Sequence, residues 1–195
     1  IVSIGTGGGG QGLTPYPSQQ ATLEPTTPEW SPGQSLGVDM VSLDYASDDI
    51  VIFHGYFGLF VYDLDSSRII RSLDLKPIKC DATQGDDYCE VSVGMDGNTV
   101  QLHRMSSENM YVYTVSDNTL RETPYERMRN GFGSNFVPIE DVIDSEKLGV
   151  YSYHAVKLDT GEYGYLHASD WTLGTLFYVR NDMMYRLFNA KESRR

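Results

Sequence analysis

A strand–turn–strand pattern recurs three times in this chain and constrains its fold more than any other feature. Each copy has a segment of alternating apolar residues, a tight turn built around an acidic residue, and a second alternating segment. The copies span residues 58–68, 110–120 and 154–165. Alternation with period two places apolar side chains on one face of a strand, and a short polar turn then reverses the chain. The pattern predicts antiparallel hairpins and an all-β fold.

The spacing of the copies leaves two arrangements of the sheets open. The turn centres Asp65, Asp117 and Asp159 lie about 50 and then about 40 residues apart, which is close to the length of one β-propeller blade. A closed propeller needs about four blades or more, and this chain has room for about three and a half. We therefore expect short antiparallel strands in either a propeller-like stack or a sandwich or barrel.

Further alternating segments extend this pattern over a single β-rich domain, residues 36–195. The strongest single hairpin signal is Asp96-Gly97-Asn98, because glycine accepts the positive φ that such turns require. The predicted strands are residues 51–54, 59–62, 69–75, 88–93, 99–103, 111–115, 120–122, 151–158, 162–167, 175–180 and 183–187. One short helix is expected near residues 138–148, because Pro138 suits a first helical position and the acidic pair after Ile139 favours the positive end of the helix dipole.

Residues 1–35 have the composition of a flexible linker. They contain no Lys or Arg, a run of glycines at 7–10, several prolines and many Ser, Thr and Gln. Such a segment buries too little apolar area to offset the entropy lost on ordering. Because the chain does not begin with Met, we expect it to start inside a longer protein or after a processing site. The linker would then lead to a membrane anchor or, alternatively, to a second soluble domain.

The charge and hydropathy of the chain limit the classes of partner that we expect it to bind. The net charge of −12 repels nucleic acid and anionic membrane surfaces, although it also serves solubility alone. The most apolar run, residues 50–62, is interrupted by His54 and two glycines and is too short to span a bilayer. We therefore expect two buried strands there, no nucleic-acid partner, and membrane contact only through a tether outside this chain.

The two cysteines, Cys80 and Cys89, bracket a turn-rich loop between predicted strands. A disulfide between them would close a short loop and stabilise the fold by roughly 2–3 kcal/mol. An even cysteine count beside an apparent stalk favours an oxidising compartment, and a pair of reduced thiols is the alternative. A metal site at this pair would need further ligands that the sequence does not supply.

No catalytic, metal or cofactor motif is present in the sequence. Nucleophile-elbow, zinc-peptidase and phosphate-loop patterns are all missing, and no acidic pair matches a calcium loop. His154 and His167 would face each other only across a two-residue turn. The segment Asp159-Thr160-Gly161 suits a three-residue loop better, and that register sets His154 against Leu166 and His167 against Tyr153. We therefore assign no catalytic residue, no metal and no cofactor.

Aromatic residues supply the one candidate binding feature of the sequence. Tyr163, Tyr165 and His167 share one face of their predicted strand, and Trp171 follows closely. A row of rings on one face stacks sugars or peptides in some proteins, and packs between sheets in others. We take Tyr163, Tyr165, His167 and Trp171 as candidate ligand-binding residues.

Two segments, residues 80–93 and 161–179, resemble the C-terminal extracytoplasmic region of clostridial membrane proteins of the M56 peptidase class, the family of the BlaR-type sensor-transducers. The resemblance covers most of residues 36–188. It implies a parent protein that joins a membrane-embedded zinc peptidase to an external sensor. This chain lacks the peptidase's zinc-binding helix and the acylating serine motif of the β-lactam sensors, so the resemblance implies only the outer domain and no covalent β-lactam ligand.

Together these features predict a non-enzymatic, extracytoplasmic sensor or ligand-binding domain, tethered to a membrane through residues 1–35. Its ligand would be a small molecule, a peptide or a glycan. Two alternatives remain at this point. One is a secreted or lipid-anchored hydrolase that acts on carbohydrate with carboxylates as acid and base. The other is a structural or adhesive surface module.

Overall fold

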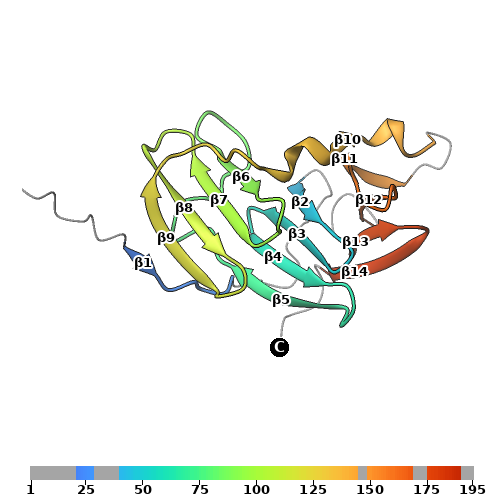
Figure 1. Ribbon diagram of the computed structural model, residues 1–195, viewed down its shortest axis with the longest axis horizontal. Helices are drawn as coiled ribbons and strands as arrows, with labels where there is room; N and C mark the ends of the chain where they lie inside the picture. The colour runs from blue at the N-terminus through green and yellow to red at the C-terminus, as the bar shows by residue number, and fades with distance from the viewer. Residues whose placement is uncertain (1–20, 29–39, 145–148, 169–174, 190–195) are drawn as a thin grey trace, which may run out of the picture.

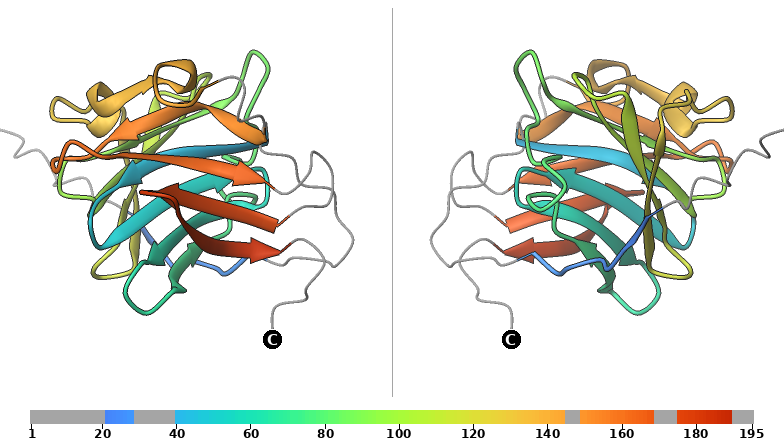
Figure 2. Two further views of the ribbon diagram at one scale, coloured as in Figure 1. Left: turned by 90° about the vertical axis from the view of Figure 1, so that its right-hand side faces the viewer. Right: turned by 90° about the vertical axis from the view of Figure 1, so that its left-hand side faces the viewer.

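The computed structural model describes residues 21–28, 40–144, 149–168 and 175–189. Within these ranges the chain forms three antiparallel β-sheets, which confirms the all-β prediction (Figure 1). The central sheet has the strand order β2-β3-β4-β5, the second sheet β1-β9-β8-β7-β6, and the third sheet β10-β11-β12-β13-β14. The central sheet lies between the other two (Figures 1 and 2).

Each sheet is built around a meander of four consecutive strands. The central sheet contains β2 (Val41–Ala46), β3 (Ile50–Gly55), β4 (Gly58–Asp63) and β5 (Arg68–Leu73). The second contains β1 (Thr22–Leu23), β6 (Cys89–Val93), β7 (Thr99–Arg104), β8 (Asn109–Thr114) and β9 (Thr119–Pro124). The third contains β10 (Phe136–Pro138), β11 (Val150–Lys157), β12 (Tyr163–Ala168), β13 (Thr175–Arg180) and β14 (Met183–Asn189).

The central sheet is buried on both faces, which explains the continuous apolar run in the sequence. Phe53 and Phe60 pair across β3 and β4 and stack with ring centroids 5.3 Å apart, and each ring lies 6.1 Å from Phe188 of β14. The neighbouring pair, Ile52 and Val61, points to the opposite face and is fully buried. A strand in the middle of three layers needs apolar residues at every position.

Polar contacts tie each outer sheet to the central sheet. Arg71 of β5 donates from Nε to the carbonyl of Val115 (3.0 Å), in the turn between β8 and β9. Arg180 of β13 pairs with Asp48, in the turn between β2 and β3 (2.6 Å), and with Glu162 before β12 (2.6 Å). The side chain of Arg180 is largely buried. The carboxylates of Asp48 and Glu162 compensate the positive charge of the guanidinium group, which would otherwise be costly to bury.

The three repeated turns share one backbone feature. Each ends in a residue with positive φ, namely Ser67 (53°), Asn118 (51°) and Gly161 (84°). The first two turns join the third and fourth strands of their meanders, whereas the third joins β11 and β12, the first two strands of its meander. The three copies are therefore the same local hairpin but do not occupy equivalent positions in the three sheets.

The predicted strands after residue 50 all form, and the predicted helix is shorter than expected. Of residues 138–148, only Ile139–Asp141 form a single turn of 3-10 helix, and residues 145–148 lie outside the described part of the chain. A lone helical turn gains few hydrogen bonds for the residues it orders. Pro138 already belongs to β10, and Val142 is only half-buried, so packing adds little. Among the described residues, no helix is long and apolar enough to cross a membrane.

Part of the predicted linker lies against the folded body. Within residues 1–35, β1 pairs with β9, and the carbonyl of Thr26 accepts a hydrogen bond from the amide of Asp74 (2.7 Å). Pro28 is buried against Gly58. We call residues 21–28 the strap, because they run from the second sheet to the central sheet. The sequence of the strap does not show the apolar–polar alternation that usually marks a strand. Its two-residue strand β1 is defined by its pairing with β9.

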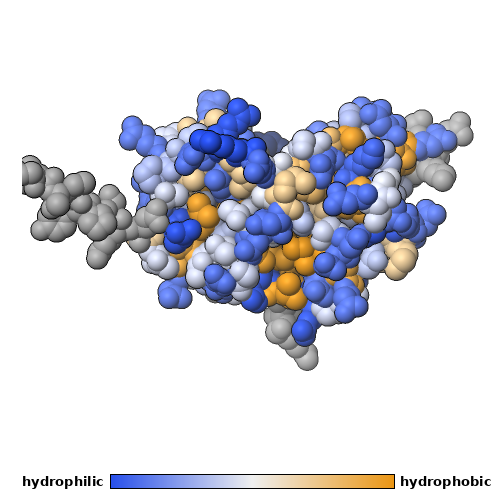
Figure 3. Space-filling view, in the orientation of Figure 1, coloured by the Kyte–Doolittle hydropathy of each residue, from blue (hydrophilic) through white to orange (hydrophobic). Residues whose placement is uncertain are grey.

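Hydrophilic residues dominate the face seen in Figure 3, with a hydrophobic area over β4 and β5. The edge strand β5 carries the half-buried Ile69 and Ile70. These residues line a cavity of about 480 Å³ together with residues of β14, such as Phe188.

Candidate functional site

Two cavities adjoin where the three sheets meet, and Phe136 of β10 lines both. The first, the apolar cavity, has a volume of about 340 Å³ and is lined by Val41, Ser42, Leu43, Phe136, Ser152, Tyr153 and His154. The second, the polar cavity, has a volume of about 440 Å³, and its lining includes Asp44, Glu90, Ser92, Gln101, His103, Tyr125, Arg127, Arg129, Ser134 and Phe136. Both volumes are typical of small-ligand sites. We call the two together the Phe136 groove.

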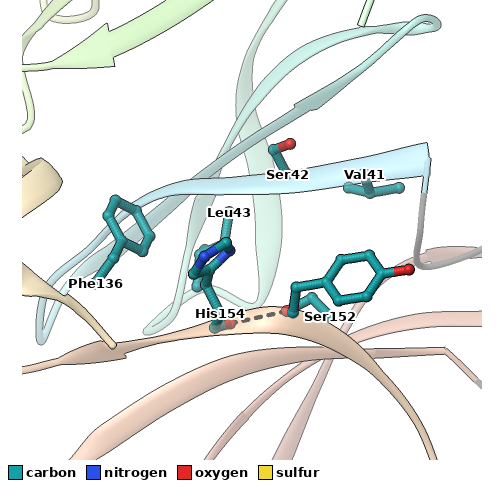
Figure 4. Close-up of a pocket in the computed structure, with 7 residues that line it drawn as sticks. Val41, Ser42, Leu43, Phe136, Ser152 and His154 are labelled. Carbon is teal, nitrogen blue, oxygen red and sulfur yellow. Dashed lines mark hydrogen bonds between the residues drawn. The ribbon is translucent and has the colours of Figure 1, made fainter. Parts of the chain in front are cut away.

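The apolar cavity lies between β2 and the pair β10–β11 (Figure 4). Leu43 points from β2 toward His154, and the rings of Phe136 and His154 meet edge to face, with centroids 6.5 Å apart. A β-bulge interrupts the pairing of β11 with β12 between Tyr151 and Ala155. The bulge releases the intervening side chains from strict alternation, so that Tyr153 stands 71% exposed at the rim.

A second bulge shapes the polar cavity. The register between β2 and β3 shifts between Leu43 and Tyr45, and the extra residue is Asp44. Leu43 and Tyr45 are both buried, and Asp44 is buried as well because the bulge redirects its side chain inward. Asp44 Oδ2 lies 2.7 Å from Nδ1 of His54 on β3, and both residues are less than 9% exposed. The carboxylate thus lies in the interior of the groove with an imidazole partner.

Burial controls the proton affinity of this carboxylate. Desolvation raises the pKa of Asp44 above its ordinary value, and the attraction of His54 opposes that shift without cancelling it. A carboxyl group whose pKa is raised inside a cavity is a candidate acid–base group. The pair can therefore act either as a hydrogen-bonding floor for a ligand or as an acid–base group.

An aromatic stack forms one wall of the polar cavity. The His103 imidazole and the Tyr125 phenol lie nearly parallel, with centroids 3.8 Å apart and 16° between their planes. Nε2 of His103 lies 2.9 Å from the carbonyl oxygen of Ser107, and a carbonyl only accepts, so Nε2 donates. Nδ1 of His103 is buried and has no hydrogen-bond partner within the described residues. The imidazole is covered, whereas Tyr125 remains 42% exposed.

The candidate ring row on β12 lies elsewhere. Tyr163, Tyr165 and His167 share the outward face of β12, as predicted, and Trp171 lies outside the described residues. Tyr151 of β11 joins the row, with its ring 5.4 Å from Tyr165 and 4.9 Å from His167. The row covers an outer sheet face and lines neither cavity of the Phe136 groove.

The histidine register follows the prediction near the turn and departs from it farther along. Leu158 and Gly161 close the three-residue loop, through a hydrogen bond of 2.9 Å from the Gly161 amide to the Leu158 carbonyl. The bulge then places His167 opposite Tyr151 instead of Tyr153. No group of three or more potential metal ligands lies together among the described residues.

Cys80 and Cys89 are both buried. The two side chains are in contact, and the thiol of Cys89 donates a hydrogen bond to the sulfur of Cys80. This bond lowers the pKa of Cys80 and raises the pKa of Cys89. The predicted disulfide stays a prediction, which mass spectrometry of the non-reduced protein can check.

The groove residues were not among the candidates taken from the sequence. Asp44 becomes buried only through the bulge, Tyr125 directly follows β9, and Phe136 lies in the short strand β10. One usable signal was present, since Val41, Leu43 and Tyr45 alternate with polar residues and indicate a strand. That strand, β2, contributes Val41, Ser42 and Leu43 to the apolar cavity and Asp44 to the polar cavity.

Comparison with known protein families found no family that matches this chain, and comparison with curated protein sequences found no match either. The interpretation of the groove therefore depends on its own geometry.

Proposed function

We propose that this chain is a ligand-binding sensor domain of a membrane signalling protein and that the Phe136 groove is its binding site. The observation that carries the proposal is the groove itself: aromatic rings and a buried, hydrogen-bonded carboxylate converge on two adjoining cavities of ligand size. Apolar walls with a few oriented polar groups are the usual composition of a binding site.

The cellular setting is also part of the proposal. The resemblance of residues 80–93 and 161–179 to extracytoplasmic regions of BlaR-type membrane peptidases supports an outer domain of such a protein. The acidic surface and the contacting cysteine pair are compatible with an exported domain. Protease treatment of intact cells that express the full-length protein tests this location. The domain should be cut without permeabilisation, and protection until the membrane is opened would contradict it.

Ligand binding is tested by two-dimensional NMR with panels of oligosaccharides, amino acids and dipeptides. Binding should perturb amides of the groove, including those of Phe136 and His154. Ser134→Trp places an indole at the polar cavity and should abolish binding. Gln84→Trp, at an exposed loop position outside the cavity lining, should not. Perturbations confined to Tyr163, Tyr165 and His167 would refute the groove and favour the ring row.

One observation favours a hydrolase as the second candidate. Asp44 and Glu90 line the same cavity, and burial raises the pKa of Asp44, as acid–base catalysis on a glycosidic bond requires. The close pairing of Asp44 with His54 occupies one of its oxygens. Incubation with aryl glycosides separates the two functions, because a hydrolase releases the phenol and loses that activity in Glu90→Gln, whereas a sensor releases none.

A further inference from the structure

The orientation of Tyr125 is set by what lies behind it. One face of its ring rests against the buried imidazole of His103, which is itself anchored to the Ser107 carbonyl. The backbone amide of Tyr125 donates to the carbonyl of Glu108 (2.9 Å). The ring is therefore held flat against one side of the polar cavity while 42% of the residue stays exposed. A planar ring with one covered face is a preorganised stacking surface.

Hydrogen-bond donors and acceptors line the same cavity as this ring. Asp44 and Glu90 supply carboxylate oxygens that accept, and Gln101 supplies both an acceptor and a donor. Asp44 is oriented by His54, so its geometry does not depend on the ligand. A cavity with one apolar plane, one fixed acceptor and further polar side chains suits a molecule that has an apolar face and several hydroxyl groups.

The charges of the cavity lining nearly cancel. The lining contains two carboxylates, Asp44 and Glu90, and two guanidinium groups, Arg127 and Arg129, of which Arg129 also lies 3.7 Å from Glu126 outside the lining. The chain as a whole carries a net charge of −12, so this local balance differs from the rest of the molecule. A balanced lining gives neither an anion nor a cation a general advantage. It favours an uncharged polar ligand.

We propose that the polar cavity binds a neutral saccharide, whose apolar ring face stacks on Tyr125 while its hydroxyl groups bond to Asp44, Glu90 and Gln101. The proposal rests on the binding function proposed above and names its ligand class. The volume of about 440 Å³ is in the range of small-ligand sites and leaves room for only a short part of a glycan chain.

Isothermal titration of the intact chain with β-1,4-linked hexamers of glucose, N-acetylglucosamine, xylose and mannose tests the ligand class. At least one hexamer should bind. Tyr125→Ala should weaken that binding about tenfold or more, whereas Tyr125→Phe keeps the ring and should remain within about threefold of wild type. Tyr163→Ala, a tyrosine of comparable exposure on the outer face of β12, is the matched control and should bind as wild type does.

The possible results separate this proposal from the wider one. Saccharide binding that Tyr125→Ala leaves unchanged, or that Tyr163→Ala abolishes, overturns the Tyr125 site. Binding of amino acids or dipeptides in the groove, with no hexamer bound at millimolar concentration, overturns the saccharide class and leaves the sensor function standing. Failure of the hexamers, the amino acids and the dipeptides alike overturns both. Circular dichroism of each variant excludes unfolding as the cause of lost binding.

Discussion

Tyr178 and Gly164 show how a single missing side chain permits the packing of the third sheet. Tyr178 is fully buried, and its hydroxyl lies directly over Gly164 on the neighbouring strand, where a Cβ atom would overlap it. That hydroxyl has no hydrogen-bond partner among the described residues, and burial raises its pKa. The glycine is needed here for space, since its φ lies outside the left-handed region.

Gly164→Ala should therefore destabilise the protein by about 1–3 kcal/mol through overpacking. Tyr178→Phe removes the closest of three clashing atoms and an unpaired polar group, so it should lie within about 1 kcal/mol of wild type. The ring carbons Cζ and Cε2 would still crowd a Cβ atom at position 164, so the double variant should recover only part of the loss. Urea unfolding followed by circular dichroism measures all three, and independent, additive effects would contradict the steric explanation.

The lowered pKa of Glu162 leads to a prediction of how the free energy of unfolding depends on pH. Hydrogen bonds from Asn181 and Arg180 lower the pKa of Glu162 below its ordinary value of 4.5. A carboxylate with a lowered folded-state pKa contributes stability above its unfolded pKa and loses it as pH falls through the folded value. Wild type should exceed Glu162→Gln in stability at pH 7, and the difference should shrink below about pH 4.5.

Urea unfolding of both proteins at pH 7, 5 and 3 measures that difference. Glu126→Gln is the control, because Glu126 and its partner Arg129 are highly exposed and 3.7 Å apart. An exposed pair contributes little, so this control should show a small difference at every pH. A Glu162 difference that stays constant from pH 7 to pH 3 would contradict the prediction.

At the scale of the elements, the hairpins could be predicted because their signals are local. Asp96-Gly97-Asn98 forms the turn between β6 and β7, with Gly97 at φ 65° and Asp96 accepting from the amide of Asn98 (2.9 Å). β1 and β10 could not be predicted, since each has only two or three residues and is defined by its pairing, β1 with the distant strand β9 and β10 with β11. β2 follows a linker-like segment, and although its sequence alternates, nothing in that alternation shows that a bulge turns Asp44 into the interior.

The strap makes an element-scale prediction. The amides of Glu122 and Asp74 donate to Ala21 and Thr26, so both should be protected from hydrogen exchange. Removing residues 1–28 deletes both acceptors and should speed exchange at these two amides about fivefold or more, equivalent to roughly 1 kcal/mol per hydrogen bond. Removing only residues 1–20 is the control and should preserve protection. Equal exchange in the two truncated chains would mean that the strap does not hold these amides.

At the scale of the whole molecule, burial of the central sheet on both faces makes the three sheets depend on one another. The apolar run over residues 50–62 allowed two buried strands to be predicted. It could not show which sheets cover them, because packing partners are distant in sequence. The site was hidden for the same reason, since Asp44, Tyr125 and Phe136 converge only when all three sheets are in place.

Phe188→Ala should test this dependence. Its ring contacts Phe53, Phe57 and Phe60 across the interface of the central and third sheets, so truncation should cost about 2–3 kcal/mol. Wild type and variant should each unfold in one transition, seen identically by far- and near-ultraviolet circular dichroism. Phe177→Ala, on the outer face of β13, should cost less. Two separate transitions in the wild type would contradict the shared core.

The position of β2 has a consequence for how the molecule would respond to occupancy. This strand contributes residues 41–44 to the lining of both cavities, and it also touches β6, β11 and β12 of the flanking sheets. A ligand in the groove would therefore contact a strand that packs against both outer sheets. The free energy of ligand binding could then shift the relative orientation of the two outer sheets. Such a shift would couple occupancy of the groove to a structural change elsewhere in the molecule.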